Sequence, residues 1–165
     1  MLELAPTEAS VVLCVAEPPA VDVVTELGDV LRVAPDEALL LASPGSAGEL
    51  VAAATRLAAE LDEDAVVLEA TDGWAIWTLR GDRAREAFAH LSALELPGSG
   101  FTQGEVAGVA AKVLVDGERI HLLVPSMWEA HLRERIVADC AHLGAIERDR
   151  PSPWGADTPD ERAEA

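Results

Sequence analysis

Three side chains that commonly bind metals, His131, Cys140 and His142, lie close together near the C-terminal end of the sequence. Imidazole and thiolate groups are typical zinc ligands, each held within about 2.3 Å of the ion. In the helix that the surrounding pattern predicts, His131 and His142 share a face but lie ~16 Å apart along the axis. Cys140 points to the opposite side. Tertiary contact could bring His90 or His121 to one of them, but surface or half-buried histidines are the commoner case.

Motifs for nucleophilic catalysis and phosphate binding are incomplete. Gly98-Ser99-Gly100 lacks the flanks of a nucleophile elbow, and Cys14 lies in an apolar strand that disfavours a thiolate. The glycine-rich stretch 98–108 lacks the Gly-Lys-Ser/Thr of a phosphate-binding loop and reads as a flexible connection. The carboxylates of 62–64 lie in solvent at a predicted helix end, which does not prepare them for acid–base catalysis. We therefore predict no catalytic, cofactor-binding or metal-binding residues.

The charge of the chain excludes one class of partner. Its 165 residues contain 12 Lys and Arg against 30 Asp and Glu, a net charge of −18. Nucleic acids and anionic membranes would be repelled, because phosphate recognition depends on a basic surface. Residues 1–79 contain 15 acidic residues and only Arg32 and Arg56 as bases, a net charge of −13. This half is either a docking face for a basic partner or a solubility surface, such as a saline habitat favours.

The remaining composition indicates a cytoplasmic protein. Cys14 and Cys140 are too few for a disulfide-stapled secreted domain. Residues 1–6 contain neither a basic region nor a continuous apolar run, so they do not resemble a signal peptide. No stretch approaches ~18 uninterrupted apolar residues, the length that a membrane-spanning helix needs.

The apolar pattern predicts two similar series of elements that would position these residues. Strand 74–79 is apolar on both faces and should be central in a sheet. Asp116-Gly117 should turn a hairpin, and Asp82 can cap the helix that follows Gly81. The expected strands are 10–16, 30–33, 38–42, 65–70, 74–79, 106–115 and 119–124, and the expected helices are 21–28, 46–61, 82–91 and 127–143.

Strand-ending prolines and helix-capping residues recur at matching positions in the two halves, which predicts a duplication. Pro44 and Pro125 each end a strand of the same length, and each precedes a capping box, Ser46–Glu49 and Ser126–Glu129. We therefore predict an α+β fold of duplicated βαββα units, with antiparallel sheets packed against helices. The repeats would span 10–62 and 65–144 within a domain of residues 1–146, followed by an acidic, proline-containing flexible tail over 147–165.

An ordered set of motifs carries a family resemblance. Residues 72–88 read DGWAIWTLRGDRAREAF and resemble the Asp, Trp, apolar strand, Gly and Ala-bearing helix of the gamma subunit of heterotetrameric sarcosine oxidase. Residues 33–41, VAPDEALLL, resemble a second segment of that family, with Ala38 where Trp is usual. Further matches are Leu94-Glu95-Leu96, Phe101, Gly104 and the LLVPS of residues 122–126. This gamma-subunit family belongs to the folate-binding superfamily of the glycine-cleavage T protein.

The resemblance implies a non-catalytic gamma-type subunit of an oxidoreductase complex that demethylates sarcosine. Its implied partners are the alpha, beta and delta subunits, which would hold FAD, FMN, NAD and tetrahydrofolate, while this chain binds no cofactor. The folate-using relatives place a catalytic Asp beside a Gly-rich strand pair, whereas Asp116-Gly117-Glu118 is an ordinary hairpin turn here. The alternatives are a stand-alone folate-binding or aminomethyltransferase-like protein and an orphan acidic interaction module of the same fold.

Four tryptophans are the predicted interface residues. Trp74 and Trp77 project to opposite faces of one strand, so one of them could meet a covering helix or a partner. Trp128 would lie in the first turn of the last helix, where an exposed indole is a suitable anchor. Trp154 lies in the predicted tail and either packs back on the domain or inserts into a partner.

Overall fold

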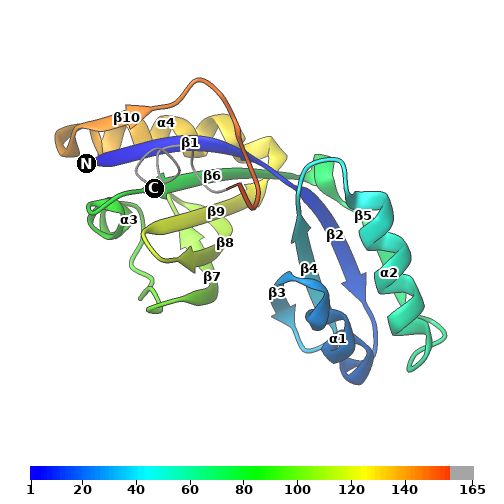
Figure 1. Cartoon of the computed structure of the whole chain (residues 1–165). Helices are drawn as coiled ribbons and strands as arrows, with labels where there is room; N and C mark the ends of the chain where they lie inside the picture. The colour runs from blue at the N-terminus through cyan, green and yellow to red at the C-terminus, as the bar shows by residue number, and fades with distance from the viewer. Residues whose placement is uncertain (157–165) are drawn as a thin grey trace, which may run out of the picture.

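The computed structural model describes residues 1–156 and contains two β-sheets, each with helices against one face (Figure 1). The smaller sheet is antiparallel throughout, in the order β3-β4-β2-β5. Helices α1 and α2 cover one of its faces. The bounds in this half are β2 Ser10–Val15, α1 Pro18–Val24, β3 Asp29–Ala34, β4 Glu37–Ala42, α2 Ala47–Ala59 and β5 Val66–Glu69, with a 3₁₀ turn η1 at Thr25–Leu27.

The larger sheet has seven strands in the order β10-β1-β6-β9-β8-β7, with β11 also paired to β1. Helices α3 and α4 cover one of its faces. The bounds are β1 Leu2–Glu8, β6 Trp74–Arg80, α3 Ala84–Leu91, β7 Gly100–Val106, β8 Val109–Asp116, β9 Arg119–Pro125, α4 Glu129–Asp139, β10 Ala145–Glu147 and β11 Ser152–Pro153. Three further 3₁₀ turns are η2 Thr71–Gly73, η3 Ser126–Trp128 and η4 Ala141–Leu143.

The two halves repeat one arrangement. The series β2-α1-β3-β4-α2 corresponds to β6-α3-β8-β9-α4, in which the additional strand β7 lies between α3 and β8. Strands β3-β4-β2 lie side by side in one sheet as β8-β9-β6 do in the other. The predicted α+β fold of duplicated βαββα units is therefore confirmed. The exact bounds of the repeats and of the domain stay predictions. The first strand, β1, pairs antiparallel to β6, just as β5 pairs antiparallel to β2. The N-terminal strand is therefore part of the sheet formed by the second half of the chain.

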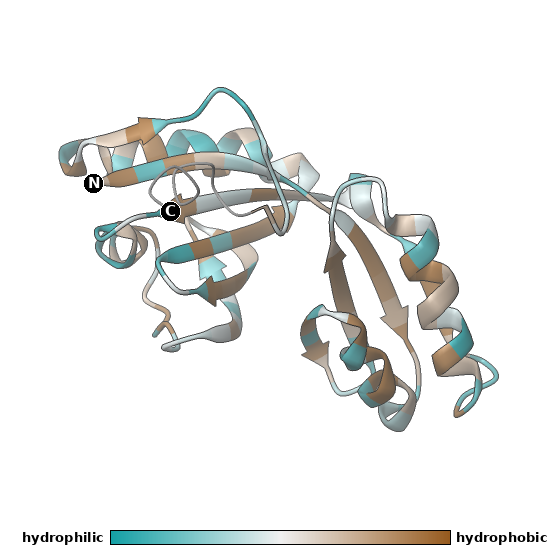
Figure 2. Cartoon of the chain, viewed as in Figure 1, coloured by the Kyte–Doolittle hydropathy of each residue, from teal (hydrophilic) through white to brown (hydrophobic). Residues whose placement is uncertain are grey.

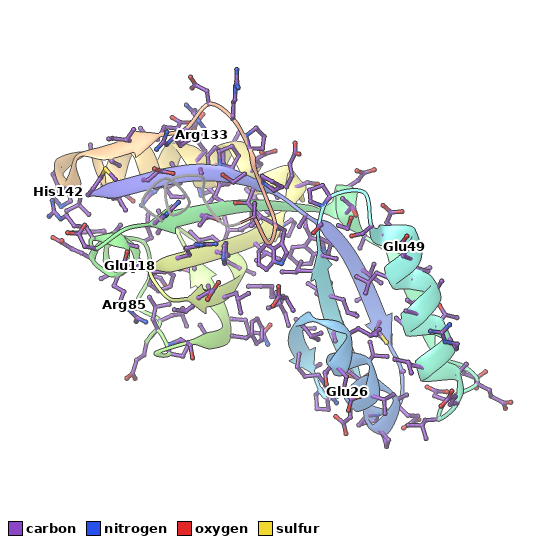
Figure 3. All side chains as sticks on the ribbon, in the orientation of Figure 1. Glu26, Glu49, Arg85, Glu118, Arg133 and His142 are labelled. Carbon is purple, nitrogen blue, oxygen red and sulfur yellow. The ribbon has the colours of Figure 1, made fainter. Side chains whose placement is uncertain are left out.

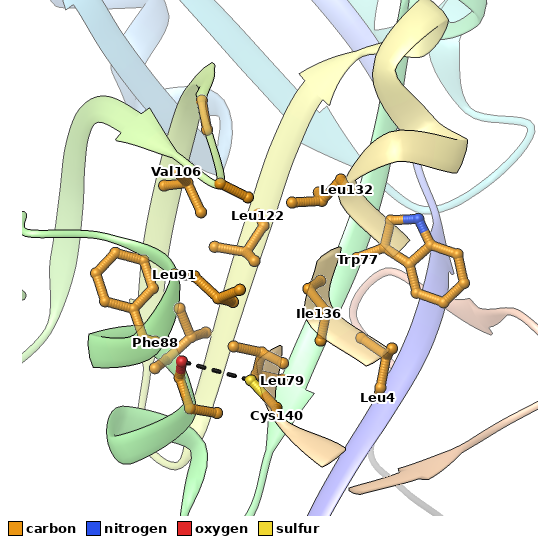
Figure 4. Packing of buried hydrophobic residues seen from close by; sticks show 14 of the residues in the cluster. Leu4, Trp77, Leu79, Phe88, Leu91, Val106, Leu122, Leu132, Ile136 and Cys140 are labelled. Carbon is orange, nitrogen blue, oxygen red and sulfur yellow. Dashed lines mark hydrogen bonds between the residues drawn. The ribbon is translucent and has the colours of Figure 1, made fainter. Parts of the chain in front are cut away.

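Three apolar clusters hold these layers together. The largest lies between the seven-stranded sheet and helices α3 and α4. Figure 4 shows Phe88, Leu122 and Ile136 among its buried side chains. A second lies between the four-stranded sheet and helices α1 and α2. The third joins the helix-free faces of the two sheets through Leu31, Leu39, Leu41, Ile76 and Leu123. Figure 2 shows apolar residues along many of the strands, whereas the helices carry both apolar and hydrophilic residues.

All seven predicted strands are present, with ends that differ by a few residues, but strands β1, β7, β10 and β11 were not predicted. Strand β6 is buried along its length between β1 and β9, as its continuous apolar sequence predicts. The hairpin β8–β9 turns at Asp116-Gly117 as expected. Strand β1 was not predicted, although Leu2 and Leu4 are fully buried. Strand β7 was predicted as a flexible glycine-rich connection, yet it pairs with β8 over its whole length.

Neither predicted capping box forms. Ser46 precedes α2, but its hydroxyl donates to the Ser43 carbonyl at 2.5 Å, and its own N–H donates to Ser10 Oγ at 3.1 Å. Both groups that a capping box would use are therefore engaged elsewhere. In the second half residues 126–128 form a 3₁₀ turn, so α4 begins only at Glu129. Asp82 likewise does not cap α3 and instead pairs with the N-terminal amine.

Part of the predicted tail is ordered against the domain. Residues 145–147 form β10 beside β1, and the chain then follows β1 to residue 156. The N–H of Arg148 donates to the Leu4 carbonyl, and that of Trp154 donates to the Glu8 carbonyl at 2.7 Å. Edge pairing with β1 explains this placement, which the charged sequence does not reveal. Residues 157–165 of the predicted tail lie outside the described residues.

Replacing Gly81 with alanine is expected to destabilise the chain. Gly81 has φ +106°, and a Cβ there would lie 2.3 Å from the Met1 carbonyl oxygen. The strained conformation and the clash together predict a loss of about 3 kcal/mol in the free energy of unfolding, measured with urea. Gly117→Ala is the matched control, because Gly117 also has positive φ but no atom within 4 Å of its Cβ. Equal losses in both variants would contradict the close approach of β1.

Candidate functional site

The four tryptophans have different environments. Trp77 is 5% exposed within the core under α4, and its indole Nε1 lacks a hydrogen-bond partner in the described part of the chain. Trp154 is 7% exposed and packs against the sheet in the isolated chain, and its role at an interface stays a prediction. Trp74 is half-buried between the two sheets. Trp128 is 42% exposed beside His131, so it is the one of the four that offers a free indole for the predicted interface.

A cavity of about 260 Å³ lies on the helix-free face of the larger sheet. Its floor consists of side chains from β1, β6, β9 and β8, and residues 152–156 close one side of it. Asp29 of β3 reaches it from the smaller sheet. The cavity is thus formed by segments from both halves and by the C-terminal part of the described chain.

A chain of polar contacts runs across this floor. Thr7 Oγ1 lies 2.7 Å from Thr78 Oγ1, which lies 2.8 Å from His121 Nδ1. The Trp154 ring covers the His121 ring at a centroid distance of 4.6 Å, and its Nε1 donates to Asp29 Oδ2 at 2.8 Å. Thr78 and His121 are both buried, and these contacts satisfy them. The sequence does not reveal this group, because its members come from five separate segments and follow no local motif.

The stability of the chain should depend on the protonation of His121. Burial lowers the pKa of His121 from 6.5 to about 4, so the folded protein favours the neutral ring. The resulting stabilisation is complete above pH 6.5 and is lost as the pH falls toward 4, by up to about 3 kcal/mol. Urea unfolding at pH 7.5 and pH 4.5 should show a smaller loss on acidification in His121→Asn than in the native chain. Identical losses would show that His121 titrates normally.

A second feature is an apolar surface on the smaller sheet. The face opposite α1 and α2 packs on the larger sheet along β3 and β4, but the β2–β5 side is uncovered. Leu13 is paired across the strands with Leu68, and Val15 with Val66. Val15, Val66 and Leu68 are 38%, 46% and 54% exposed. We call these four residues the β2–β5 face.

Acidic residues surround one end of the β2–β5 face. Val15 and Val66 line a shallow hollow together with Glu17, Asp36, Asp62 and Asp64. Figure 3 shows Glu26 and Glu49 on the helical side of the same half, whereas the labelled bases Arg85 and Arg133 lie in the other half. The apolar surface therefore lies within the half of the chain whose net charge is −13.

The candidate metal ligands are spread over the second half. His142 meets His90, with 3.2 Å between their Nε2 atoms, while His131 Nε2 lies 2.9 Å from the Ala107 carbonyl oxygen. Burial raises the pKa of the Cys140 thiol, which lies 3.6 Å from the Ala87 carbonyl oxygen (Figure 4). Among residues 1–156 no three His, Cys, Asp or Glu side chains are placed to share an ion.

Burial also raises the pKa of the Cys14 thiol. Cys14 is fully enclosed in the cluster under α1 and α2, so it is a core residue, as the sequence indicates.

No helix within residues 1–156 is long and apolar enough to cross a bilayer.

Comparison with known proteins identifies the fold. No family description and no curated protein sequence matches the chain. A chain of heterotetrameric sarcosine oxidase from Corynebacterium sp. U-96, solved in complex with pyrrole 2-carboxylate, is similar with a TM-score of 0.74 at 16% identity, over 89% of this chain and 87% of that one. Glycine-cleavage aminomethyltransferase T from Bartonella henselae gives a TM-score of 0.65 at 13% identity, over 88% of this chain.

The chain has the folate-binding fold of these two proteins. It spans 47% of the aminomethyltransferase chain. A weaker likeness, with a TM-score of 0.51 at 9% identity, joins it to the regulatory subunit of aspartate kinase from Thermus thermophilus. The predicted fold class is confirmed, and the chain resembles a subunit of a sarcosine oxidase in its structure.

Proposed function

We propose that this chain is a gamma-type subunit of a heterotetrameric sarcosine oxidase and supports assembly of the complex without an active site of its own. The observation that carries the proposal is the fold likeness to a chain of such an oxidase, which extends over nearly the whole length of both chains. The ordered motifs at residues 33–41 and 72–88 support it independently, since they come from the sequence alone.

The β2–β5 face supplies the docking surface in this proposal. A free domain gains nothing by exposing Val15, Val66 and Leu68 together, whereas contiguous apolar surface with a polar rim is typical of protein interfaces. The acidic residues around the hollow favour a partner with basic residues at the matching positions. The occupant is a larger oxidase subunit whose apolar patch is bordered by arginine or lysine, so that the charges are complementary.

The cofactors belong to the partners in this proposal. FAD, FMN, NAD and tetrahydrofolate are assigned to the other subunits, and this chain holds none of them. Titration of the isolated chain with tetrahydrofolate tests that assignment, since micromolar binding would favour a stand-alone folate-binding protein instead.

Co-expression of the chain with the alpha, beta and delta oxidase subunits from the same genome tests the proposal directly. We expect one complex in size-exclusion chromatography, with the chain in equal amount to the others. Raising the salt concentration should speed dissociation, because the acidic rim contributes to association. A chain that elutes alone beside an assembled alpha–beta–delta complex would refute the proposed function.

A further inference from the structure

The floor of the cavity carries an unusual row of charges. Across strands β1, β6, β9 and β8, Glu3 lies opposite Arg80, Arg80 opposite Arg119, and Arg119 opposite Asp116. All four side chains line the cavity. Glu3 is paired with Arg148 at 2.8 Å rather than with Arg80. Within residues 1–156, neither the Arg80 side chain nor the Arg119 side chain forms an ion pair or a hydrogen bond.

Two unpaired arginines on neighbouring strands are costly. Like charges directly opposite one another destabilise a sheet, and both side chains are half-buried, which reduces screening by water. The chain has only 12 basic residues, so placing two of them face to face is not a consequence of a basic composition. An anion between the two guanidinium groups would turn this repulsion into two charge-assisted contacts.

The rest of the cavity limits the charge of such an anion. Among the lining residues, Glu3, Asp29 and Asp116 outnumber Arg80 and Arg119 by one charge. Arg148 pairs with Glu3 from outside the lining, so the local charge is close to zero with His121 uncharged. One negative charge on a ligand is tolerated there, whereas a doubly charged phosphate would add repulsion from three carboxylates.

The walls indicate the body of the ligand. Ala5, Leu114 and the Trp154 ring are apolar, and His121 Nε2 has no hydrogen-bond partner among residues 1–156. Among the described residues, the fully buried side-chain nitrogen and oxygen atoms that lack a partner do not include His121 Nε2. This nitrogen is therefore accessible to a ligand or to water. A volume of about 260 Å³ suits a small molecule rather than a nucleotide or a pterin with its tail.

From these contacts we infer that the cavity binds a small organic monocarboxylate, with its carboxylate between Arg80 and Arg119 and its apolar body beneath Trp154. The site does not depend on assembly with other subunits, so it can be tested on the full chain alone. Its failure would leave the proposed subunit role untouched.

Isothermal titration with benzoate, benzylamine and inorganic phosphate tests the inference. We expect saturable binding of benzoate only. Arg119→Gln and Arg80→Gln should each weaken benzoate binding by about tenfold or more, which corresponds to loss of one charge-assisted contact. Arg56→Gln is the matched control, because Arg56 is exposed on α2, away from the cavity, and should bind benzoate as the native chain does.

Thermal unfolding of the ligand-free variants provides a second readout. If the arginines repel each other, Arg119→Gln should melt at an equal or higher temperature than the native chain. A lower melting temperature in both Arg80→Gln and Arg119→Gln, with benzoate binding unchanged, would show that they are structural and would overturn the inference. Phosphate binding as tight as benzoate binding would overturn the carboxylate class.

Discussion

Leu68→Asp is expected to prevent the chain from joining an oxidase complex. Leu68 is 54% exposed, the most exposed residue of the β2–β5 face, so the variant should fold with almost unchanged stability. In the complex, the new carboxylate would be buried without a partner in an apolar contact. That predicts a loss of about 3 kcal/mol in binding free energy, or roughly a hundredfold in Kd, measured by co-purification and by titration against the assembled partners.

Ile146→Asp is the matched control for this experiment. Ile146 is 51% exposed on β10 of the larger sheet, so the substitution adds the same charge at a similarly exposed apolar residue of the other half. Trp128→Ala compares the docking surface with the remaining exposed tryptophan. If Leu68→Asp assembled fully and Trp128→Ala did not, the interface would lie at the start of α4 and not on the β2–β5 face.

Trp154→Ala is expected to produce the largest loss of stability among the substitutions considered. Trp154 is 7% exposed, covers the His121 ring and donates to Asp29. Removing a buried indole predicts a loss of ~3 to 5 kcal/mol in the free energy of unfolding by urea. Because the ring also shields His121, the pKa of His121 should rise from about 4 toward 6.5, which a histidine NMR titration would detect.

Trp154→Phe separates the two contributions of this residue. Phenylalanine keeps an aromatic ring over His121 but cannot donate to Asp29, so most of the stability and the low pKa of His121 should return. If Trp154→Ala unfolded at the same urea concentration as the native chain, the segment 152–156 would not be held against the sheet in solution.

The sequence predicted the strands whose apolar residues recur without interruption. The strand at residues 74–79 and the Asp116-Gly117 hairpin were predicted correctly because continuous apolar runs and turn residues are local signals. Strand β1 was missed because Glu3, Pro6 and Glu8 interrupt the apolar residues of this segment, so that it resembles a polar terminus. Strand β7 was missed because its glycines resemble a loop until the pairing with β8 is known.

The candidate site could not be predicted from local sequence patterns. Thr7, Thr78 and His121 are far apart in the chain, and only the register of β1, β6 and β9 brings them together. The pairing of Arg80 with Arg119 has the same origin. By contrast, the acidic bias of the first half was readable from composition, and the structure adds that an apolar surface lies among those acids.

The position of β1 has a consequence for the order in which the chain can form during synthesis. Every strand of the smaller sheet lies between residues 10 and 69, so this sheet can close as soon as that segment has left the ribosome. The larger sheet needs the first residues beside β6 and β10, which are made 70 to 140 positions later. The N-terminal strand must therefore wait unpaired, tethered to a half that is already folded, until the last strands arrive to enclose it.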